Sequence, residues 1–169
     1  MVDVVGSRLL GRAAEHVVVA EFQLRGYEVV VPDLDRGVDL YVQSAEMAGC
    51  GREMKPVQVK AGRGVGLKRV DGFRAQFRLP WKQLLDSEDG GLVYVLIGLC
   101  PEEVIEPRFG GGGWESIVIP RSELLILMDL GLGTRGEDQL VVSLTFRRDR
   151  VTDHGIDLQW YRNGYEGVF

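Results

Sequence analysis

Cysteine is scarce in this chain of 169 residues, which has two, Cys50 and Cys100. They lie far apart and form neither a C-x-x-C pair nor a Cys/His pattern with the spacing of metal ligands. This scarcity argues against a disulfide framework and against a cysteine-based zinc site. We expect both residues to be free thiols.

Long apolar runs and an excess of positive charge are also missing. The longest apolar run, Leu92 to Leu99, is too short to cross a bilayer, and no basic leader followed by an apolar segment stands at the amino terminus. We therefore expect a soluble, cytoplasmic protein. The net charge of -5 argues against a protein that coats nucleic acid through a global basic field. With 45% hydrophobic residues, the chain is long enough for a single domain over residues 1–169.

Motifs of several other enzyme classes are absent as well. No serine or cysteine stands in a nucleophile elbow. The glycine-rich stretches 62–66 and 110–113 lack the spacing of a dinucleotide fingerprint and the Lys-Ser/Thr of a phosphate-binding loop. We interpret both as loops.

The first third of the chain predicts a helix followed by three strands. Residues 8–25 show helical periodicity and stop at Gly26, and residues 27–31, 38–43 and 57–61 read as strands. The short connection between the first two strands predicts an antiparallel hairpin. The main apolar stripe of the helix is expected at positions Leu10, Ala13, Ala14, Val17, Ala20 and Leu24. Other apolar residues fall outside that stripe, so we expect burial on more than one side.

The rest of the chain predicts further strands and two short helices. Alternating residues 73–79 indicate a half-exposed strand, 80–86 a short helix, and 92–99 a fully buried strand. Strands at 117–119 and 140–146 flank a helix that ends near Leu130. The expected fold class is α/β: a helix, a three-stranded antiparallel or mixed sheet, then a helix and further strands, with one sheet layer flanked by helices.

Three polar residues stand where strands usually have apolar ones. Asp39 interrupts the apolar run 38–42, and aspartate is depleted in strands. Gln58 and Lys60 are two residues apart, so both project from one face of their strand, opposite to its valines. We interpret this set as a candidate catalytic site. The alternative is a turn cap, an exposed strand residue and a lysine at a strand end.

The residue types suit a magnesium-dependent phosphodiester site. Magnesium takes few protein ligands, all of them oxygen, and it neutralises the charge that protects a phosphodiester from attack. Asp39, the amide oxygen of Gln58 and the backbone carbonyl of Val59 could supply three oxygens. Lys60 cannot bind the metal, but it can orient water or stabilise charge on the phosphate.

A carboxylate of the first helix is expected to complete the set. Glu15 lies among apolar residues on a helix predicted to be buried, so it needs an ion pair, a metal or a wet cleft. Glu21 is the rival candidate, and an ordinary ion pair remains open for either residue.

Basic residues are concentrated between Lys60 and Lys82. This segment contains seven basic residues and one acidic residue, Asp71. We expect Arg63, Lys68, Arg69 and Arg74 to contact the phosphates of a nucleic acid. The alternative is a solvated face, with Arg74 and Arg78 on the outward side of an edge strand.

The order of these motifs resembles the PD-(D/E)XK nuclease superfamily. The resemblance covers residues 6–62 and, more weakly, 117–124. It rests on Gly11-Arg12-Ala13-Ala14-Glu15, Gly26-Tyr27-Glu28-Val29, Pro32, Gly37-Val38-Asp39-Leu40 and Val57-Gln58-Val59-Lys60. The resemblance implies a restriction-endonuclease-like fold and cleavage of DNA with Mg²⁺ or Mn²⁺. Under it Glu15 is the helix acid, Asp39 the central metal ligand, and Gln58 with Lys60 the last motif.

Gln58 departs from the family pattern, which has Asp or Glu at this position. The amide keeps an oxygen but removes one negative charge, which weakens a metal site without abolishing it. Two functions follow: a metal-dependent DNA endonuclease, or a catalytically inactive module of the same fold that binds nucleic acid or a protein partner. On duplex DNA a homodimer would place one site on each strand.

Overall fold

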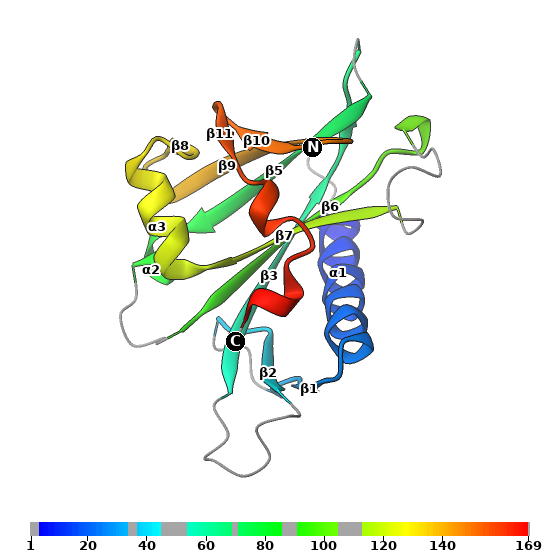
Figure 1. The fold of residues 1–169 in the computed structure, drawn as a ribbon, viewed down its shortest axis with the longest axis vertical. Coiled ribbons are helices and arrows are strands. Elements are labelled where there is room, and N and C mark those ends of the chain that lie inside the picture. Colours follow the sequence, from blue (N-terminus) through cyan, green and yellow to red (C-terminus); the bar gives the residue numbers. More distant parts are fainter. Residues whose placement is uncertain are drawn as a thin grey trace.

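The structure is a computed structural model that describes residues 4–33, 37–44, 54–68, 71–85, 91–104 and 113–168. It opens with helix α1 (Val4–Leu24), shown in blue in Figure 1, and continues into a five-stranded sheet. The strands of this first sheet follow the order β1-β2-β3-β6-β7. Their bounds are β1 Tyr27–Val30, β2 Leu40–Ser44, β3 Lys55–Arg63, β6 Val93–Leu99 and β7 Trp114–Pro120.

The pairing of the first sheet is mixed. β1 and β2 form the predicted antiparallel hairpin, with Val29 opposite Val42. β2 is antiparallel to β3, β3 is parallel to β6, and β6 is antiparallel to β7. A helix followed by a mixed sheet is the fold class expected from the sequence.

A second sheet lies against the first, and here the expectation of one sheet layer is wrong. It follows the order β11-β10-β9-β5-β4, with β8 paired to β9. Its strands are β4 Val65–Gly66, β5 Gly72–Pro80, β8 Thr134–Arg135, β9 Gln139–Arg147, β10 Val151–Asp153 and β11 Ile156–Asp157. The physical reason is the alternation in β5: one face is exposed and the other is apolar, and an apolar face must be covered by a second layer. The shorter helices are α2 Trp81–Leu84 and α3 Arg121–Asp129, with 3₁₀ turns at Glu102–Val104, Gln159–Tyr161 and Tyr165–Val168.

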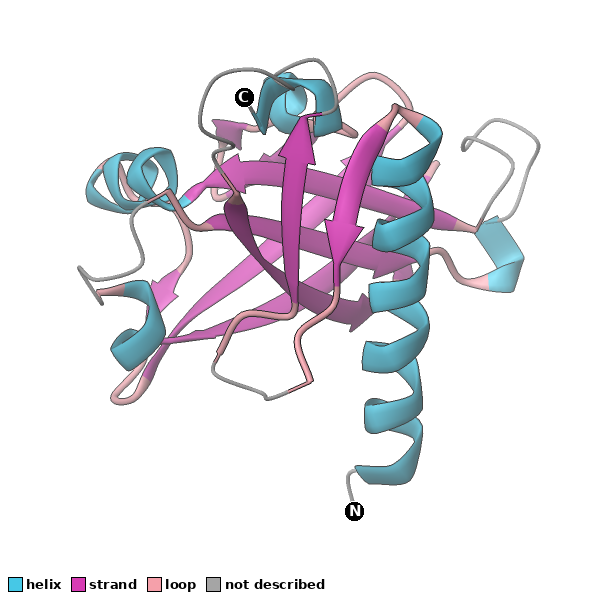
Figure 2. Cartoon of the chain, turned by 90° about the horizontal axis from the view of Figure 1, so that it is seen from below, coloured by secondary structure: helices cyan, strands magenta, loops and turns pink. Residues whose placement is uncertain are grey.

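Strand β6 separates the two halves of the core. Val95 and Ile97 pack in the cluster that includes α1, whereas Tyr94 and Leu96 pack in the cluster that includes β5 and β9. Both faces of β6 are therefore buried, which explains its continuous apolar run. Figure 2 shows α1 running along one side of the strands.

The buried stripe of α1 differs from the one expected. Ala14, Val18 and Phe22 are fully buried, while Leu24 is 82% exposed. Because this helix is apolar almost all round, its periodicity could not decide between two stripes. The observed one buries the bulky Phe22 against Tyr165, with ring centroids 5.0 Å apart.

The stretch 62–66 is also different from the expected loop. β3 continues to Arg63, and Val65–Gly66 forms β4, which pairs with β5 in the second sheet. At this crossing the backbones are close, because a Cβ on Gly62 would lie 2.9 Å from the carbonyl oxygen of Gln76. The glycines serve close packing between the sheets.

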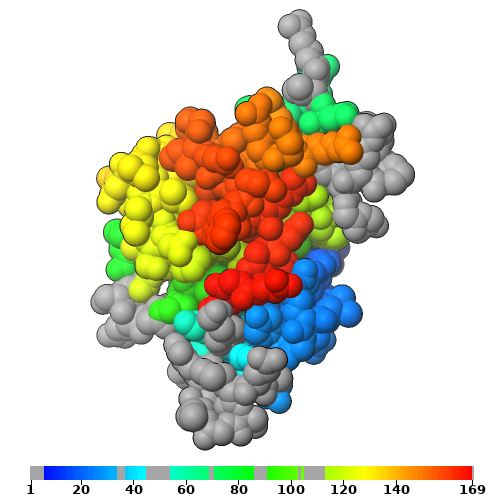
Figure 3. Space-filling view, in the orientation of Figure 1, coloured from blue at the N-terminus to red at the C-terminus, as the bar shows by residue number. Residues whose placement is uncertain are grey.

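The C-terminal segment closes one face of the molecule. Figure 3 shows it (orange to red) between α3 (yellow) and α1 (blue). Tyr165 and Val168 are buried against the first sheet, whereas Trp160 is 91% exposed. Within the described part of the chain, every helix is too short or too polar to span a membrane. Cys100 is a buried free thiol, and Cys50 lies outside the described residues.

Candidate metal centre and basic groove

Asp39 lies one residue before β2, at the point where β2 and β3 stop pairing. Its backbone N–H donates to the carbonyl of Val57 at 3.0 Å. Its carboxylate oxygen Oδ2 accepts the backbone N–H of Val59 at 2.7 Å. The side chain of Asp39 thus supplies an acceptor for a β3 backbone N–H beyond the last paired residue of β2.

Gln58 stands beside Asp39 with its side chain almost fully buried, at 5% exposure. Its amide nitrogen donates to Asp39 Oδ2 and, at 3.4 Å, to the carbonyl of Val59. The structure therefore brings the oxygens of Asp39 and Val59 together at Gln58, whose nitrogen, not its oxygen, faces them. The alternation of β3 is as predicted, because Val57 and Val59 pack in the cluster with α1.

Gln83, on α2, is a member of this site that the sequence analysis did not identify. Its amide nitrogen donates to the side-chain oxygen of Gln58 and to the backbone carbonyl of Gly37. Gly37 has φ +83, and a Cβ at this residue would lie 3.3 Å from the Gln83 nitrogen. No sequence pattern links positions 37, 58 and 83, so only the folded chain reveals the contact.

Lys60 lies further along β3, beyond the last residue that pairs with β2 among the described residues. In the part of the chain that the structure describes, β2 pairs with β3 only as far as Val57. A groove of about 580 Å³ is found here. It is lined by Ser7, Leu10, Lys60, Ala61, Gly62, Arg63, Gln76 and Arg78. Three basic side chains from β3 and β5 therefore share one groove with the amino-terminal half of α1.

The two candidate helix acids lie on opposite flanks of the buried stripe of α1. Glu21 pairs with Arg25 at 2.5 Å and faces a cleft lined by Ile97 and Trp114 of β6 and β7. Glu15 is half-buried, and at 100° per residue it falls on the other flank. Leu10, which lines the basic groove, lies about 140° around the helix from Glu15, so its place in the groove does not put Glu15 there.

Only some of the residues predicted to contact phosphates lie in the basic groove. Arg63 is exposed in the groove, and Lys68 is exposed in the turn after β4. Arg74 is on the outer face of β5, where its Nε donates to Thr145 Oγ1 at 3.3 Å. Arg69 lies outside the described residues. Arg78 joins the groove, and its place in the alternation of β5 is the signal that could have identified it.

The donor set around Asp39 fits a hard divalent cation only if it includes neutral oxygens. Among the described residues, no group of three or more His, Cys, Asp or Glu side chains is placed to hold a metal. Magnesium accepts carbonyl and amide oxygens and keeps several waters. The carboxylate of Asp39 and the carbonyl of Val59 meet this requirement, Gln58 would meet it with its amide turned so that the oxygen replaces the nitrogen, and Glu15 is the second acid to be tested.

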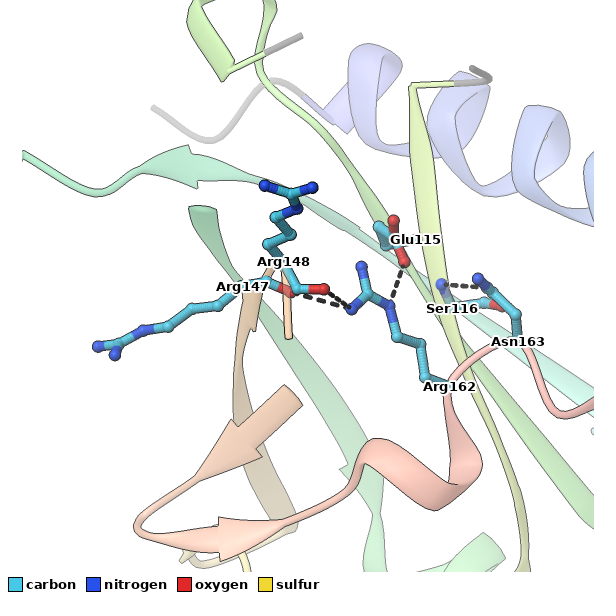
Figure 4. Close-up of polar contacts among 6 residues, drawn as sticks. All are labelled: Glu115, Ser116, Arg147, Arg148, Arg162 and Asn163. Atoms are coloured by element: carbon cyan, nitrogen blue, oxygen red, sulfur yellow. Dashed lines mark hydrogen bonds and ion pairs between the residues drawn. The ribbon is translucent and has the colours of Figure 1, made fainter. Parts of the chain in front are cut away.

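A second polar cluster, drawn in Figure 4, fastens the C-terminal segment to β7. Glu115 is 3% exposed and pairs with Arg162 Nε at 2.9 Å. The Nη1 of Arg162 donates to the backbone carbonyls of Arg147 and Arg148 at 2.9 and 3.1 Å. The hydroxyl of Ser116 donates to Asn163 Oδ1 at 2.9 Å. The contacts join β7, the end of β9 and the C-terminal segment.

Comparison with known proteins gives a match at the level of the fold. No protein-family model and no curated protein sequence matches the chain. A solved structure, that of the bacterial homing endonuclease I-Ssp6803I, matches with a TM-score of 0.51 at 14% sequence identity. The match covers 95% of this chain and 88% of the other. The match shows the fold alone: the chain has a restriction-endonuclease-like fold, as the resemblance in the sequence implied.

Proposed function

We propose that this protein is a metal-dependent endonuclease that hydrolyses phosphodiester bonds of DNA. The main supporting observation is the convergence of the Asp39 carboxylate and the Val59 carbonyl on one point, the amide nitrogen of Gln58. This point adjoins a basic groove that contains Lys60. The shared fold with a homing endonuclease supports the same proposal.

Asp39, Gln58, Val59 and Glu15 are the residues that would hold Mg²⁺ or Mn²⁺. When bound, the ion supplies neutralisation of phosphate charge and a hydroxide nucleophile at neutral pH. Asp39 is fixed by the Val59 N–H, so its carboxylate is oriented before any substrate arrives. Lys60 places an ammonium group in the groove, where it would stabilise negative charge that develops on the phosphate.

The groove gives the substrate a direction. Lys60, Arg63 and Arg78 line it together, and neutralised phosphates release counterions, which favours binding to a polyanion. The net charge of -5 makes this concentration of basic residues a local feature. We infer that the DNA backbone follows β3 toward Asp39, with Lys68, Arg69 and Arg74 as outer contacts.

A second candidate function is a catalytically inactive module that binds nucleic acid or a protein partner. The observation that favours it is Gln58 itself, since its amide nitrogen stands between Asp39 and Val59. If this orientation is permanent, the groove remains a binding surface without a metal.

Nicking of supercoiled plasmid with Mg²⁺ or Mn²⁺ distinguishes the two functions. The wild type should nick, and Asp39→Ala and Lys60→Ala should not, whereas Lys82→Ala, an exposed lysine on α2, should match the wild type. DNA binding without metal-dependent cleavage in the wild type would favour the inactive module.

The helix acid is tested by a matched pair of variants. Glu15→Gln should lower the nicking rate, and Glu21→Gln should not, because Glu21 faces the cleft at β6 and β7. The reverse result would assign the role to Glu21. If the protein acts on duplex DNA as a homodimer, sedimentation with DNA should show two chains per duplex.

A further inference from the structure

The amides of Gln58 and Gln83 form a continuous chain of hydrogen bonds from Gly37 to Asp39. Gln83 donates to the carbonyl of Gly37 and to the amide oxygen of Gln58. Gln58 in turn donates to Asp39 and to the carbonyl of Val59. Both hydrogens of each amide nitrogen therefore have an acceptor.

The direction of this chain is fixed by its two ends. A carboxylate and a backbone carbonyl can only accept, so the nitrogen of Gln58 must face Asp39 and Val59. Its oxygen then faces Gln83, so Gln83 must donate a hydrogen bond from its side-chain nitrogen. The same nitrogen of Gln83 also serves the Gly37 carbonyl, so Gln83 makes two hydrogen bonds in this orientation and one in the reversed orientation.

A metal at this site requires the opposite orientation. The Gln58 nitrogen donates to the same two oxygens, of Asp39 and Val59, that a cation would need. For Gln58 to offer its oxygen, the amide must turn over and present its nitrogen to Gln83. Gln83 can accept that nitrogen only by turning its own oxygen toward Gln58, and it then loses the bond to Gly37.

We propose that Gln83 is a positioning residue that holds the Gln58 amide in the metal-excluding orientation, so that the two amides turn over together when the metal binds. This inference rests on the proposed function, because it concerns the same centre. Gln83 thereby opposes metal binding, and the opposition equals the hydrogen bond to Gly37 that is lost. One such bond corresponds to about a fivefold change in affinity.

The test measures Mn²⁺ affinity by calorimetry in two backgrounds, the wild type and Gln58→Glu. A carboxylate at position 58 has two equivalent oxygens, so turning it over does not change which atom faces the metal. Gln83→Leu, which keeps the charge of the site, should tighten Mn²⁺ binding about fivefold in the wild-type background. In the Gln58→Glu background the same change should stay within about twofold. A Gln83→Glu variant, which only accepts hydrogen bonds, should tighten binding more in the wild-type background than in Gln58→Glu.

A second readout follows the amides directly. In ¹⁵N-labelled wild-type protein, addition of Mg²⁺ should shift the side-chain amide resonances of both Gln58 and Gln83. Resonances of Gln83 that stay in place at saturation would overturn the proposal. Equal effects of Gln83→Leu in the two backgrounds would overturn it as well.

The outcomes separate this inference from the proposed function. Metal binding with the expected background dependence but no DNA cleavage would leave the Gln83 inference standing and refute the nuclease. Cleavage with no background dependence would do the reverse. No Mn²⁺ binding in any variant would overturn both.

Discussion

Two carboxylates of the first sheet, Asp39 and Glu115, are held in different ways. Glu115 pairs with the guanidinium of Arg162, which is itself tied to the carbonyls of Arg147 and Arg148. Asp39 accepts a backbone N–H and the side-chain amide of Gln58. An ion pair anchored at both ends fastens the fold, while an amide that can turn over leaves room for a cation. The difference separates a structural cluster from a candidate functional one.

The largest effect that this comparison predicts is on cleavage. Asp39→Ala should lower the rate of metal-dependent nicking by about 10³-fold, the scale seen when a key electrostatic group is lost. Asp39→Ala should also lower the melting temperature, because the buried Gln58 amide and the Val59 N–H lose their acceptor, whereas Asp39→Asn, which keeps an acceptor oxygen, should change it little. Nicking rates and thermal unfolding of the same preparations check both parts. A variant that nicks like the wild type would remove Asp39 from the centre.

For the Glu115–Arg162 pair we expect the opposite pattern, a loss of stability without a loss of nicking. Arg162→Met leaves Glu115 buried without its partner and should lower the free energy of unfolding by about 3 kcal/mol. Nicking at a temperature where the variant is folded should be unchanged. The double variant Glu115→Leu/Arg162→Met should recover part of this loss, because it no longer buries an unpaired charge. Chemical denaturation measures both, and an unaffected stability of Arg162→Met would contradict the structural role.

Alkaline pH should weaken the same structural region. Burial raises the pKa of Tyr165 from 10 to about 12, so its neutral form is favoured in the folded state. This stabilisation is complete below pH 10 and is lost as the pH rises toward 12, by about 2 kcal/mol at pH 12. The free energy of unfolding, measured between pH 9 and about 12, should fall with this slope, and Tyr165→Phe should reduce the slope. A slope in Tyr165→Phe equal to that of the wild type would contradict the assignment.

The smallest predicted effect concerns the groove beside Asp39. Arg78→Gln should weaken DNA binding about fivefold and lower the dependence of log affinity on log salt by about one unit. Arg148→Gln, an exposed arginine near the structural cluster, should leave both unchanged. Fluorescence anisotropy over a range of salt concentrations makes the comparison. Equal losses in the two variants would show that the groove is not the binding surface.

The sequence predicted the parts of the fold that depend on local pattern. The hairpin of β1 and β2, the alternation of β3 and the burial of β6 follow from residue spacing, and all three are observed. The second sheet was missed because alternation in β5 shows that one face is covered, but not by which layer. The prediction of the buried stripe of α1 was wrong because the helix has apolar residues on nearly every side.

The candidate site was predictable only where strand geometry fixes it. Asp39 and Gln58 were placed together from their strands, and the structure joins them. Gln83 and the pair Glu115–Arg162 were not found, because they join residues 25 and 47 positions apart through tertiary packing. No periodicity or motif spans such separations.

Diffraction from crystals grown with Mn²⁺ shows whether a metal binds at Asp39. We expect one anomalous peak between the Asp39 carboxylate and the Val59 carbonyl, with the Gln58 amide turned so that its oxygen faces the peak and its nitrogen faces Gln83. The absence of a peak at Asp39 at saturating Mn²⁺, with the Gln58 nitrogen still bonded to Asp39, would contradict this expectation.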